Sequence, residues 1–555
     1  MNTNINAVKK ILYIFLLCLL AAAIPLSRYV MSVTQFAIMA LWLIEGMTFE
    51  QLAHKKFGLS FITVLLGEIF NSLAIQIKKF WFNKPAVIIA SLYLLHIIGL
   101  LYTDDFQWAL KDLRVKLPLL SIPVLLSGFP KLSKKEIYTI FSIHALAVLA
   151  GTIIITANYF NTQTVDIREL YTYISHIRFS LNVVLAIFAI GFIASNTDCY
   201  SKKIKYFAFA IVLWLTLFLF IFKALTGIVI FLAIAMTILL IGVFKIKRIS
   251  LKVIALLALV SIPLLFTTNF IYSYNDYTKA EAIIISELDS YTELGNKYTH
   301  DTIHYGIEQG RYIGLYINKK ELSNAWNKVS TIPIDGKDKK DQNIYYTIIR
   351  YLNSKNLRKD AAGVQQLSKQ DIKNIENGIA NYYYTLPFNL KSRTDQIIMG
   401  YLKYKQHNNA NRNSIMQRIE YWRASWDIFT SHAIIGVGTG DMNLVFKEEY
   451  NSHNFNLHKN FQLRSHNQYM AIAIAFGIIG LIWFLISFIA PSIILSAYKN
   501  YLFVIHFSIL FLSMLWEDTL ETQAGVTFAI FFYSLLLFTQ KHKEENKKSI
   551  IHEIN

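Results

Sequence analysis

Long apolar runs recur along the chain and constrain its fold more than any other feature. The first extends from Ile11 to Leu26, and similar runs follow through the first half and the C-terminal part. A run of about 20 apolar residues can cross a bilayer, and helices satisfy every backbone group there. Because 54% of the 555 residues are hydrophobic and only 16% are charged, we predict an all-α polytopic membrane protein.

The apolar runs divide into about twelve predicted transmembrane helices. The first run also resembles a secretory signal, but no small-x-small cleavage site stands clearly after it, so we keep it as a span. The segment from Phe49 to Lys79 is apolar enough in Ile62 to Ile75 to be a span, but basic residues flank both of its ends, which favours an interfacial amphipathic helix. The predicted spans are residues 8–27, 33–47, 85–102, 117–129, 138–157, 178–196, 206–223, 225–243, 251–271, 467–495, 501–516 and 524–539.

The net charge of +18 comes mainly from short basic clusters between the spans. This distribution indicates membrane orientation rather than nucleic-acid binding, because loops rich in lysine and arginine stay on the cytoplasmic side. Twelve spans place both termini in the cytoplasm, in agreement with the basic tail. The clusters are Lys131 with Lys134 and Lys135, Lys202 with Lys203 and Lys205, Lys245 with Lys247 and Arg248, and residues 541–548.

A polar segment separates the two blocks of spans and is the candidate soluble domain. Periodic apolar positions predict helices over Ile348 to Leu357, Leu367 to Ile379 and Ile415 to Phe429. Ser368 and Asp371 have the spacing of a capping box at the start of the second of these helices. The predicted organisation is spans one to nine in 1–271, an outer loop domain in 272–465, three spans in 466–540 and a cytoplasmic tail in 541–555.

The most informative stretch reads QRIEYWRASWDIFTSHAIIGVGTGD from Gln417, followed by RSHNQYMAIAIAFGIIGL from Arg464. An R-x-x-x-W motif, a G-V-G-T-G turn and an H-N-x-Y motif at the mouth of a glycine-containing span together resemble the O-antigen ligase/polymerase family. The tract from Tyr345 to Gly378 and the N-terminal stretches ALWLIEG and LLYTDD…LKDLRVKLPLLSIPVLL are similar to Bacteroidetes-type members. The matching residues are Arg418, Trp422, Gly436, Gly438, Gly440, His466, Asn467, Tyr469, Gly477 and Gly480.

The resemblance implies a GT-C-like glycosyltransferase of the bacterial inner membrane, with its site facing the periplasm. Its donor is expected to be a glycan linked to undecaprenyl pyrophosphate, and its acceptor a hydroxyl of lipid A core or of a growing glycan. A polymerase of the same family, a protein O-oligosaccharyltransferase and a transporter of lipid-linked glycans are the alternatives. The transporter is disfavoured because paired repeats and charges at mid-membrane depth are not apparent.

Arg418 and His466 are the predicted catalytic residues. Arginine offers a permanently charged fork that suits a departing pyrophosphate, and histidine can accept the proton of an attacking hydroxyl. Positioning of the acceptor or a hydrogen bond to pyrophosphate is an equally suitable role for His466. An ordinary solvated arginine and a solvated histidine at a helix end are the alternatives, and the family resemblance favours function.

Further residues are predicted to bind substrate because they lie beside this pair or at the start of a span. A charge such as that of Arg178 is costly in a membrane unless it is paired or hydrated; snorkelling to the headgroups is the alternative. The glycine turn has no Gly-Lys-Ser/Thr and is predicted to be mainly a tight turn. The predicted substrate-binding residues are Arg178, His176, Arg464, Asn467, Tyr469, Trp422, Gly436 and Gly438.

The sequence departs from the family pattern at two places. Ala224 and Leu225 stand where members often carry a Ser-Arg pair, so Lys223 or Arg178 would supply that charge. Ala475 occupies a position that is often glutamate, and no carboxylate role is assigned there. No cluster of histidine, aspartate and glutamate has convincing metal-ligand spacing. We therefore expect chemistry without a metal or another cofactor.

Overall fold

The computed structural model describes residues 2–47, 59–161, 170–171, 174–196, 201–280, 282–386, 390–411 and 413–539. Within these ranges nine helices are long and apolar enough to cross a membrane, and two shorter apolar helices lie near the C-terminus. This confirms an all-α polytopic membrane protein. The chain divides into two compact units, residues 1–238 with 418–555, and residues 239–417.

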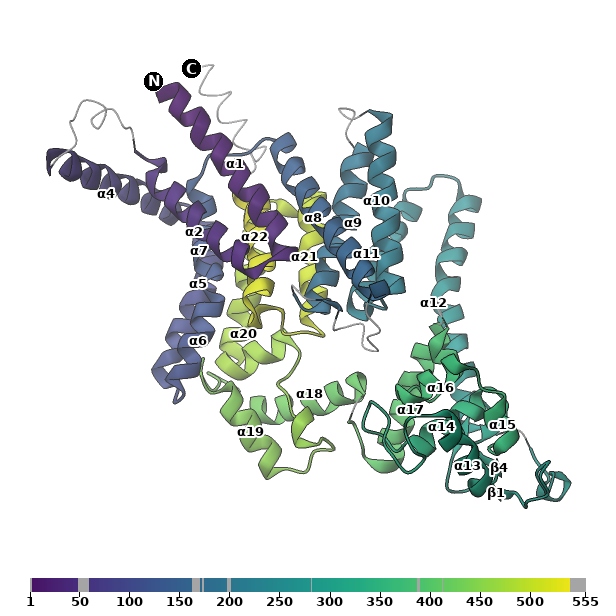
Figure 1. Ribbon diagram of the computed structural model, residues 1–555. Coiled ribbons are helices and arrows are strands. Elements are labelled where there is room, and N and C mark those ends of the chain that lie inside the picture. Colours follow the sequence, from purple (N-terminus) through teal and green to yellow (C-terminus); the bar gives the residue numbers. More distant parts are fainter. Residues whose placement is uncertain are drawn as a thin grey trace. The chain divides into compact units, whose positions relative to one another are not determined.

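Unit 1 is a helical bundle (Figure 1). Helix α1 packs along α2 and α8, α5 packs against α7 and α20, and α9 lies against α10 and α21. The helices in or bordering this unit are α1 (Asn2–Leu26), α2 (Arg28–Glu45), α4 (Leu59–Phe82), α5 (Lys84–Ile98), α6 (Phe106–Lys116), α7 (Pro118–Gly128), α8 (Lys134–Asn161), α9 (His176–Asn196), α10 (Lys202–Ile221), α11 (Leu225–Phe244), α18 (Ser414–Ser431), α19 (Met442–Ser452), α20 (Gln468–Ile494), α21 (Tyr501–Met514) and α22 (Gln523–Phe538), with short 3-10 turns η1 (Gly99–Tyr102), η5 (Lys459–Phe461), η6 (Ala497–Lys499) and η7 (Thr519–Glu521).

Helix α22 forms the interior of this bundle, drawn in yellow among α1, α7 and α21 (Figure 1). Its residues from Ala524 to Phe538 are all buried. It begins at Thr522, whose side chain accepts a hydrogen bond from the Gly525 amide and so satisfies one of the free donors of the first turn. The buried helix fixes the level at which the preceding loop emerges from the bundle.

The predicted spans coincide with helices, but α2 and α7 are not among the nine membrane-capable helices or the two shorter apolar ones, whereas α4 is one of the nine. Helix α7 has 11 residues. At about 1.5 Å per residue it covers roughly half of a 30 Å hydrocarbon core, so it cannot span the membrane alone. Part of the segment that we expected to lie at the interface forms α4, which is long and apolar enough for a span over Phe61–Phe82. Residues 49–58 of that segment lie outside the described ranges.

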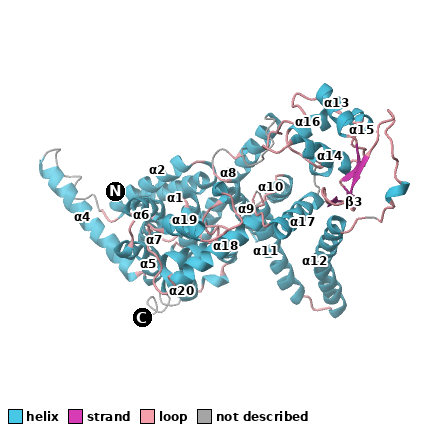
Figure 2. Cartoon of the chain, turned by 90° about the horizontal axis from the view of Figure 1, so that it is seen from below, coloured by secondary structure: helices cyan, strands magenta, loops and turns pink. Residues whose placement is uncertain are grey.

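Unit 2 combines helices with two small antiparallel sheets, and the strands are shown in magenta beside α14 and α15 (Figure 2). Its core packs around Trp326, Ile348, Tyr351 and Leu352, all fully buried. Its elements are α12 (Ile249–Thr278), η3 (Ile285–Glu287), β1 (Thr299–Asp301), β2 (Ile307–Glu308), β3 (Arg311–Tyr312), β4 (Gly314–Ile317), α13 (Lys319–Val329), α14 (Ile344–Ser354), α15 (Ala361–Gln365), α16 (Lys369–Glu376), η4 (Tyr382–Thr385) and α17 (Leu390–His407).

The helices predicted in the polar segment are present as α14, α16 and α18. Helix α16 begins with the predicted capping box, in which Ser368 and Asp371 each accept a hydrogen bond from the other's backbone amide. The boundaries of the compact units differ from the expected domain limits. Residues 418–465 belong to the unit that contains the bundle. Arg418, Arg464 and His466 consequently lie in one compact unit.

Candidate active site

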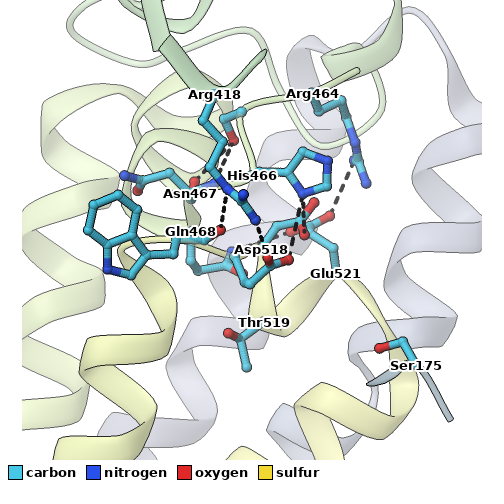
Figure 3. Close-up of polar contacts among 12 residues, drawn as sticks. Ser175, Arg418, Arg464, His466, Asn467, Gln468, Asp518, Thr519 and Glu521 are labelled. Carbon is cyan, nitrogen blue, oxygen red and sulfur yellow. Dashed lines mark hydrogen bonds and ion pairs between the residues drawn. The ribbon is translucent and has the colours of Figure 1, made fainter. Parts of the chain in front are cut away.

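An acidic loop joins α21 to α22 and forms the centre of the candidate site. We define it as residues 515–522, reading LWEDTLET. Glu517 and Glu521 have side chains only 6% and 9% exposed, and Asp518 is 16% exposed. Buried carboxylates are costly unless cations or hydrogen-bond donors neutralise them. Figure 3 shows that Arg418 and Arg464 reach this loop on either side of His466.

Arg418 is bound to the first carboxylate of the acidic loop. It lies in the second turn of α18, and its Nη2 donates a 2.6 Å hydrogen bond to Glu517 Oε1. Its Nε donates to the backbone carbonyl of Trp516 at 3.2 Å. The guanidinium is therefore fixed by a charge-assisted bond while its side chain remains 21% exposed. An anion arriving from solvent can reach it.

His466 faces the same carboxylate from the loop that precedes α20. Its Nδ1 lies 3.6 Å from Glu517 Oε2 and 3.8 Å from Asp518 Oδ1, and it makes no hydrogen bond. The residue has a φ of 45°, a left-handed backbone conformation that is uncommon for residues other than glycine. The imidazole lies against the ring of Tyr421, 5.5 Å between centroids. The backbone and this ring together direct Nδ1 toward the two carboxylates.

A buried ion-pair network occupies the other side of the acidic loop. Arg464 Nη1 donates to Glu521 Oε2 at 3.3 Å, and Lys116 Nζ lies 3.0 Å from Glu521 Oε1. The same ammonium binds Asp112 at 2.8 Å, one turn earlier on α6. Gln468 adds two bonds, donating to Glu521 and accepting from the Leu520 amide. The charges of two cations, Lys116 and Arg464, thus balance those of two carboxylates. Glu521 connects Arg464 to α6 through Lys116.

Arg178 supports the acidic loop from α9. Its Nη2 donates to the carbonyl of Asp518 at 3.3 Å, and its Nη1 donates to the Ser175 hydroxyl at 3.2 Å. Its Nε is buried and makes no hydrogen bond. Four cationic side chains, from α6, α9, α18 and the loop before α20, therefore converge on one eight-residue loop.

Charge and burial set the pKa values of the acidic loop in opposite directions. Burial raises the pKa of Glu517, but attraction to His466 and Arg418 outweighs it and leaves that pKa below its usual value. Burial likewise opposes ionisation of Glu521, and the charges of Lys116 and Arg464 hold its pKa low. For Asp518, burial prevails over His466 and the pKa is raised. Glu517 is thus the ionised partner that His466 and Arg418 share.

The remaining predicted side chains have mainly supporting contacts. Asn467 accepts the Tyr469 and Met470 amides as the N-cap of α20 and donates to the Leu515 carbonyl at 3.1 Å. The Tyr469 hydroxyl donates to the Phe511 carbonyl on α21. The Trp422 ring lies 5.4 Å from that of Trp516 in the acidic loop. His176, at the start of α9, contacts the Tyr171 ring. Their substrate-binding roles remain predictions.

The glycine turn fills a break in α20. Gly477 has a φ of 63° inside that helix, and a Cβ there would lie 2.1 Å from the Ile434 carbonyl oxygen. The turn fits this gap because Gly436, at φ 73°, has no side chain. A Cβ at Gly436 would lie 2.4 Å from the carbonyl carbon of Ala475.

The amides of this turn are used within the protein. Those of Val437 and Gly438 donate to the carbonyls of Ile474 and Ala475, and that of Gly440 to the Thr103 hydroxyl. Asp441 then accepts the amides of Asp104 and Asp105 at the start of α6. The turn thereby holds in place the helix that carries Lys116.

One group of possible metal ligands is present among the described residues. His466, Glu517 and Asp518 each offer an atom within 4.8 Å of the others. Sequence spacing did not reveal this group, because His466 lies in the loop before α20, whereas Glu517 and Asp518 lie in the loop after α21. Glu517 is already a counter-ion of Arg418, and metal independence remains a prediction.

Sequence reasoning missed the acidic loop and the two α6 residues Asp112 and Lys116. One signal was present: the loop places three carboxylates within five residues, Glu517 to Glu521, between two apolar runs. Charged groups so close to spans are candidates for function or for ion pairing. Four of the predicted residues, Arg418, His466, Arg464 and Arg178, meet at this loop, and their roles remain predictions.

A family model matches part of the sequence that forms this site. The O-antigen ligase family model matches residues 370–485, which include Arg418, the glycine turn, Arg464 and His466. No curated protein matches the chain. Together with the membrane-capable helices, the match indicates a multi-pass inner-membrane protein. The match assigns residues 370–485, about a fifth of the chain, to the O-antigen ligase family.

Proposed function

We propose that this chain transfers a glycan from undecaprenyl pyrophosphate to an acceptor hydroxyl at the periplasmic face of the inner membrane. The observation that carries the proposal is the sharing of Glu517 by Arg418 and His466, at 2.6 and 3.6 Å. A pyrophosphate binder and a proton acceptor are thereby held side by side on a GT-C-like membrane scaffold.

Arg418 is the proposed binder of the leaving group. Breaking the glycosidic bond to the donor phosphate leaves a negative charge on pyrophosphate, and a guanidinium stabilises that charge as it develops. Arg464 and Arg178 supply further positive charge at the same loop, and both are bound to groups within it. The buried carboxylates hold these cations in position before the donor arrives.

His466 is the proposed base. The acceptor hydroxyl gives its proton to Nε2, its oxygen bonds to the anomeric carbon of the donor sugar, and the bonding electrons of the broken C–O bond leave with pyrophosphate. Nδ1 faces Glu517 and Asp518, so the imidazolium formed in this step is stabilised by their charge. Glu517 thus orients the base and the leaving-group binder together.

Ligation to lipid A core and polymerisation onto a growing glycan use the same donor chemistry. We propose ligation as the activity and retain polymerisation as the alternative. Supplying full-length protein in lipid nanodiscs with an undecaprenyl pyrophosphate-linked glycan, and with lipid A core or a second lipid-linked glycan as acceptor, separates the two. Ligation requires a product that carries lipid A core.

The site assignment is tested in the same assay. General-base removal costs about 10²- to 10⁴-fold in rate, so His466→Ala should fall in that range. Arg418→Ala should also lose transfer. Two matched controls are Arg423→Ala, on α18 but placed over the Phe455 ring, and the exposed His432→Ala. Wild-type rates for both site variants would refute the assignment.

A further inference from the structure

A polar groove lies in unit 2, far along the sequence from the acidic loop. Helix α13, the turn from Tyr291 to Lys297 and the short helix α15 form its walls. The cavity has a volume of about 410 Å³, within the range of about 300–1,000 Å³ that is usual for ligand pockets. We name it the α13 groove.

The α13 side of the groove carries a row of polar residues. Lys320, Asn324 and Lys328 follow one another at intervals of four and therefore lie on one face of the helix. All three are exposed and line the groove. Two ammonium groups about two turns apart thus flank an amide, which gives this wall positive charge and hydrogen-bonding capacity.

The opposite side contributes amides and apolar edges. Asn296 and Gln365 line it, and both side chains can donate and accept hydrogen bonds. Leu294 on this side is 69% exposed, and Val329 at the end of α13 is 46% exposed. Such a combination suits a sugar ring, which offers hydroxyls at its edge and C–H groups on its faces.

The one carboxylate in the groove offsets part of the lysine charge, and the lining keeps a net positive charge. Glu321 is 7% exposed, and its Oε1 accepts hydrogen bonds from Thr292 at 2.5 Å and Asn296 at 2.6 Å. Its Oε2 faces the Ala361 amide at 3.5 Å. These donors direct both oxygens toward the protein, where Glu321 ties the turn and α15 to α13. The lining thus presents two lysines against one carboxylate whose oxygens are hydrogen-bonded within the protein.

We propose that the α13 groove binds an acidic oligosaccharide, whose carboxylates pair with Lys320 and Lys328 while its hydroxyls bond to the three amides. This inference rests on the proposed function, since the chain would then hold part of an acidic acceptor or growing glycan in unit 2. A bare phosphate would use the lysines alone and leave the amides and apolar side chains without a role.

The test measures binding to full-length protein in nanodiscs by saturation-transfer NMR and calorimetry. The probes are a galacturonic acid trisaccharide, a neutral galactose trisaccharide and inorganic phosphate. Lys320→Gln/Lys328→Gln should weaken the acidic probe about 2- to 30-fold, the range for two exposed ion pairs, and added salt should weaken it in the wild type. Asn324→Lys should strengthen it.

Lys369→Gln/Lys403→Gln is the matched control, with the same charge change on exposed lysines of unit 2 outside the groove. Equal binding of acidic and neutral trisaccharides, equal binding of phosphate, or equal losses in both double variants would overturn the proposal. His466→Ala should retain the acidic trisaccharide at wild-type affinity. Groove binding in a protein that transfers no glycan would refute the proposed function while leaving the groove assignment intact.

Discussion

Lys116→Met removes the cation that Asp112 and Glu521 share inside unit 1. In the wild type, Lys116 and Arg464 balance Asp112 and Glu521, so the substitution leaves two buried carboxylates against one arginine. The lysine side chain is 6% exposed and the aspartate 9%. Breaking a pair buried to this degree costs about 3–5 kcal/mol, because the remaining charge stays desolvated.

A second lysine–aspartate pair provides the matched control. Lys337 and Asp341 are also four residues apart and 2.7 Å from each other, but their side chains are 66% and 69% exposed. Lys337→Met should therefore cost about 0–1 kcal/mol. Lys116→Met/Asp112→Asn restores charge balance and should recover most of the stability lost by Lys116→Met alone.

The assay is thermal unfolding of full-length protein in detergent, followed by tryptophan fluorescence. Burial raises the pKa of Asp112 even beside Lys116, and removing the lysine raises it further. The folded single variant then binds a proton more tightly than the unfolded chain, so its deficit relative to the wild type should shrink as the pH falls through that raised pKa. Equal losses for Lys116→Met and Lys337→Met, or no recovery in the double variant, would show that burial does not determine what the Lys116–Asp112 pair contributes to stability.

Three further outcomes follow from the site. Gly436→Ala should lower the free energy of unfolding by at least about 1–2 kcal/mol, because φ is 73° and the added Cβ would meet the Ala475 backbone. Gly67→Ala on α4 is the control in the same unfolding assay: its Cβ meets no neighbour, so it should be neutral or stabilising. Asp518→Asn should raise the melting temperature at pH 7.5 while lowering transfer, because the raised pKa of Asp518 means that its ionised form costs stability. The gain in melting temperature should fade as the pH falls through the raised pKa toward about 4, and a pH-independent difference would contradict the assignment. Transfer should persist after EDTA treatment and dialysis, because arginines supply the charge, and activity restored only by a divalent cation would instead assign a metal to His466, Glu517 and Asp518.

The helices of the bundle were predictable because the signal for each is local. An apolar run in lipid has to be helical, whatever it packs against. The same signal does not report burial: α22 is enclosed on all sides, whereas α12 is mostly exposed, and both appear as apolar runs. Helix α6 was missed because it is short and polar on average, and its start depends on the Asp105 cap and on Asp441.

For a related reason, the sequence predicted the cationic residues of the candidate site but not its carboxylates. Arg418 and His466 stand in motifs that resemble a known family, so their residue types and order identified them. Glu517 was not identified, because its role depends on contacts with Arg418, 99 residues away in sequence, and with His466. A glutamate in a short loop has no local feature that distinguishes it from a solvated one. The structure adds the carboxylates that hold the predicted cations in place.

The most direct test of the account separates donor binding from transfer. Affinity for undecaprenyl pyrophosphate and the glycan transfer rate are measured on full-length Arg418→Ala, His466→Ala and Arg423→Ala. Loss of a charged hydrogen bond, about 1.5–3 kcal/mol, predicts roughly 10- to 150-fold weaker binding for Arg418→Ala. His466→Ala should bind the lipid like the wild type yet transfer about 10²- to 10⁴-fold more slowly. Wild-type affinity in Arg418→Ala, or wild-type transfer in His466→Ala, would contradict the account.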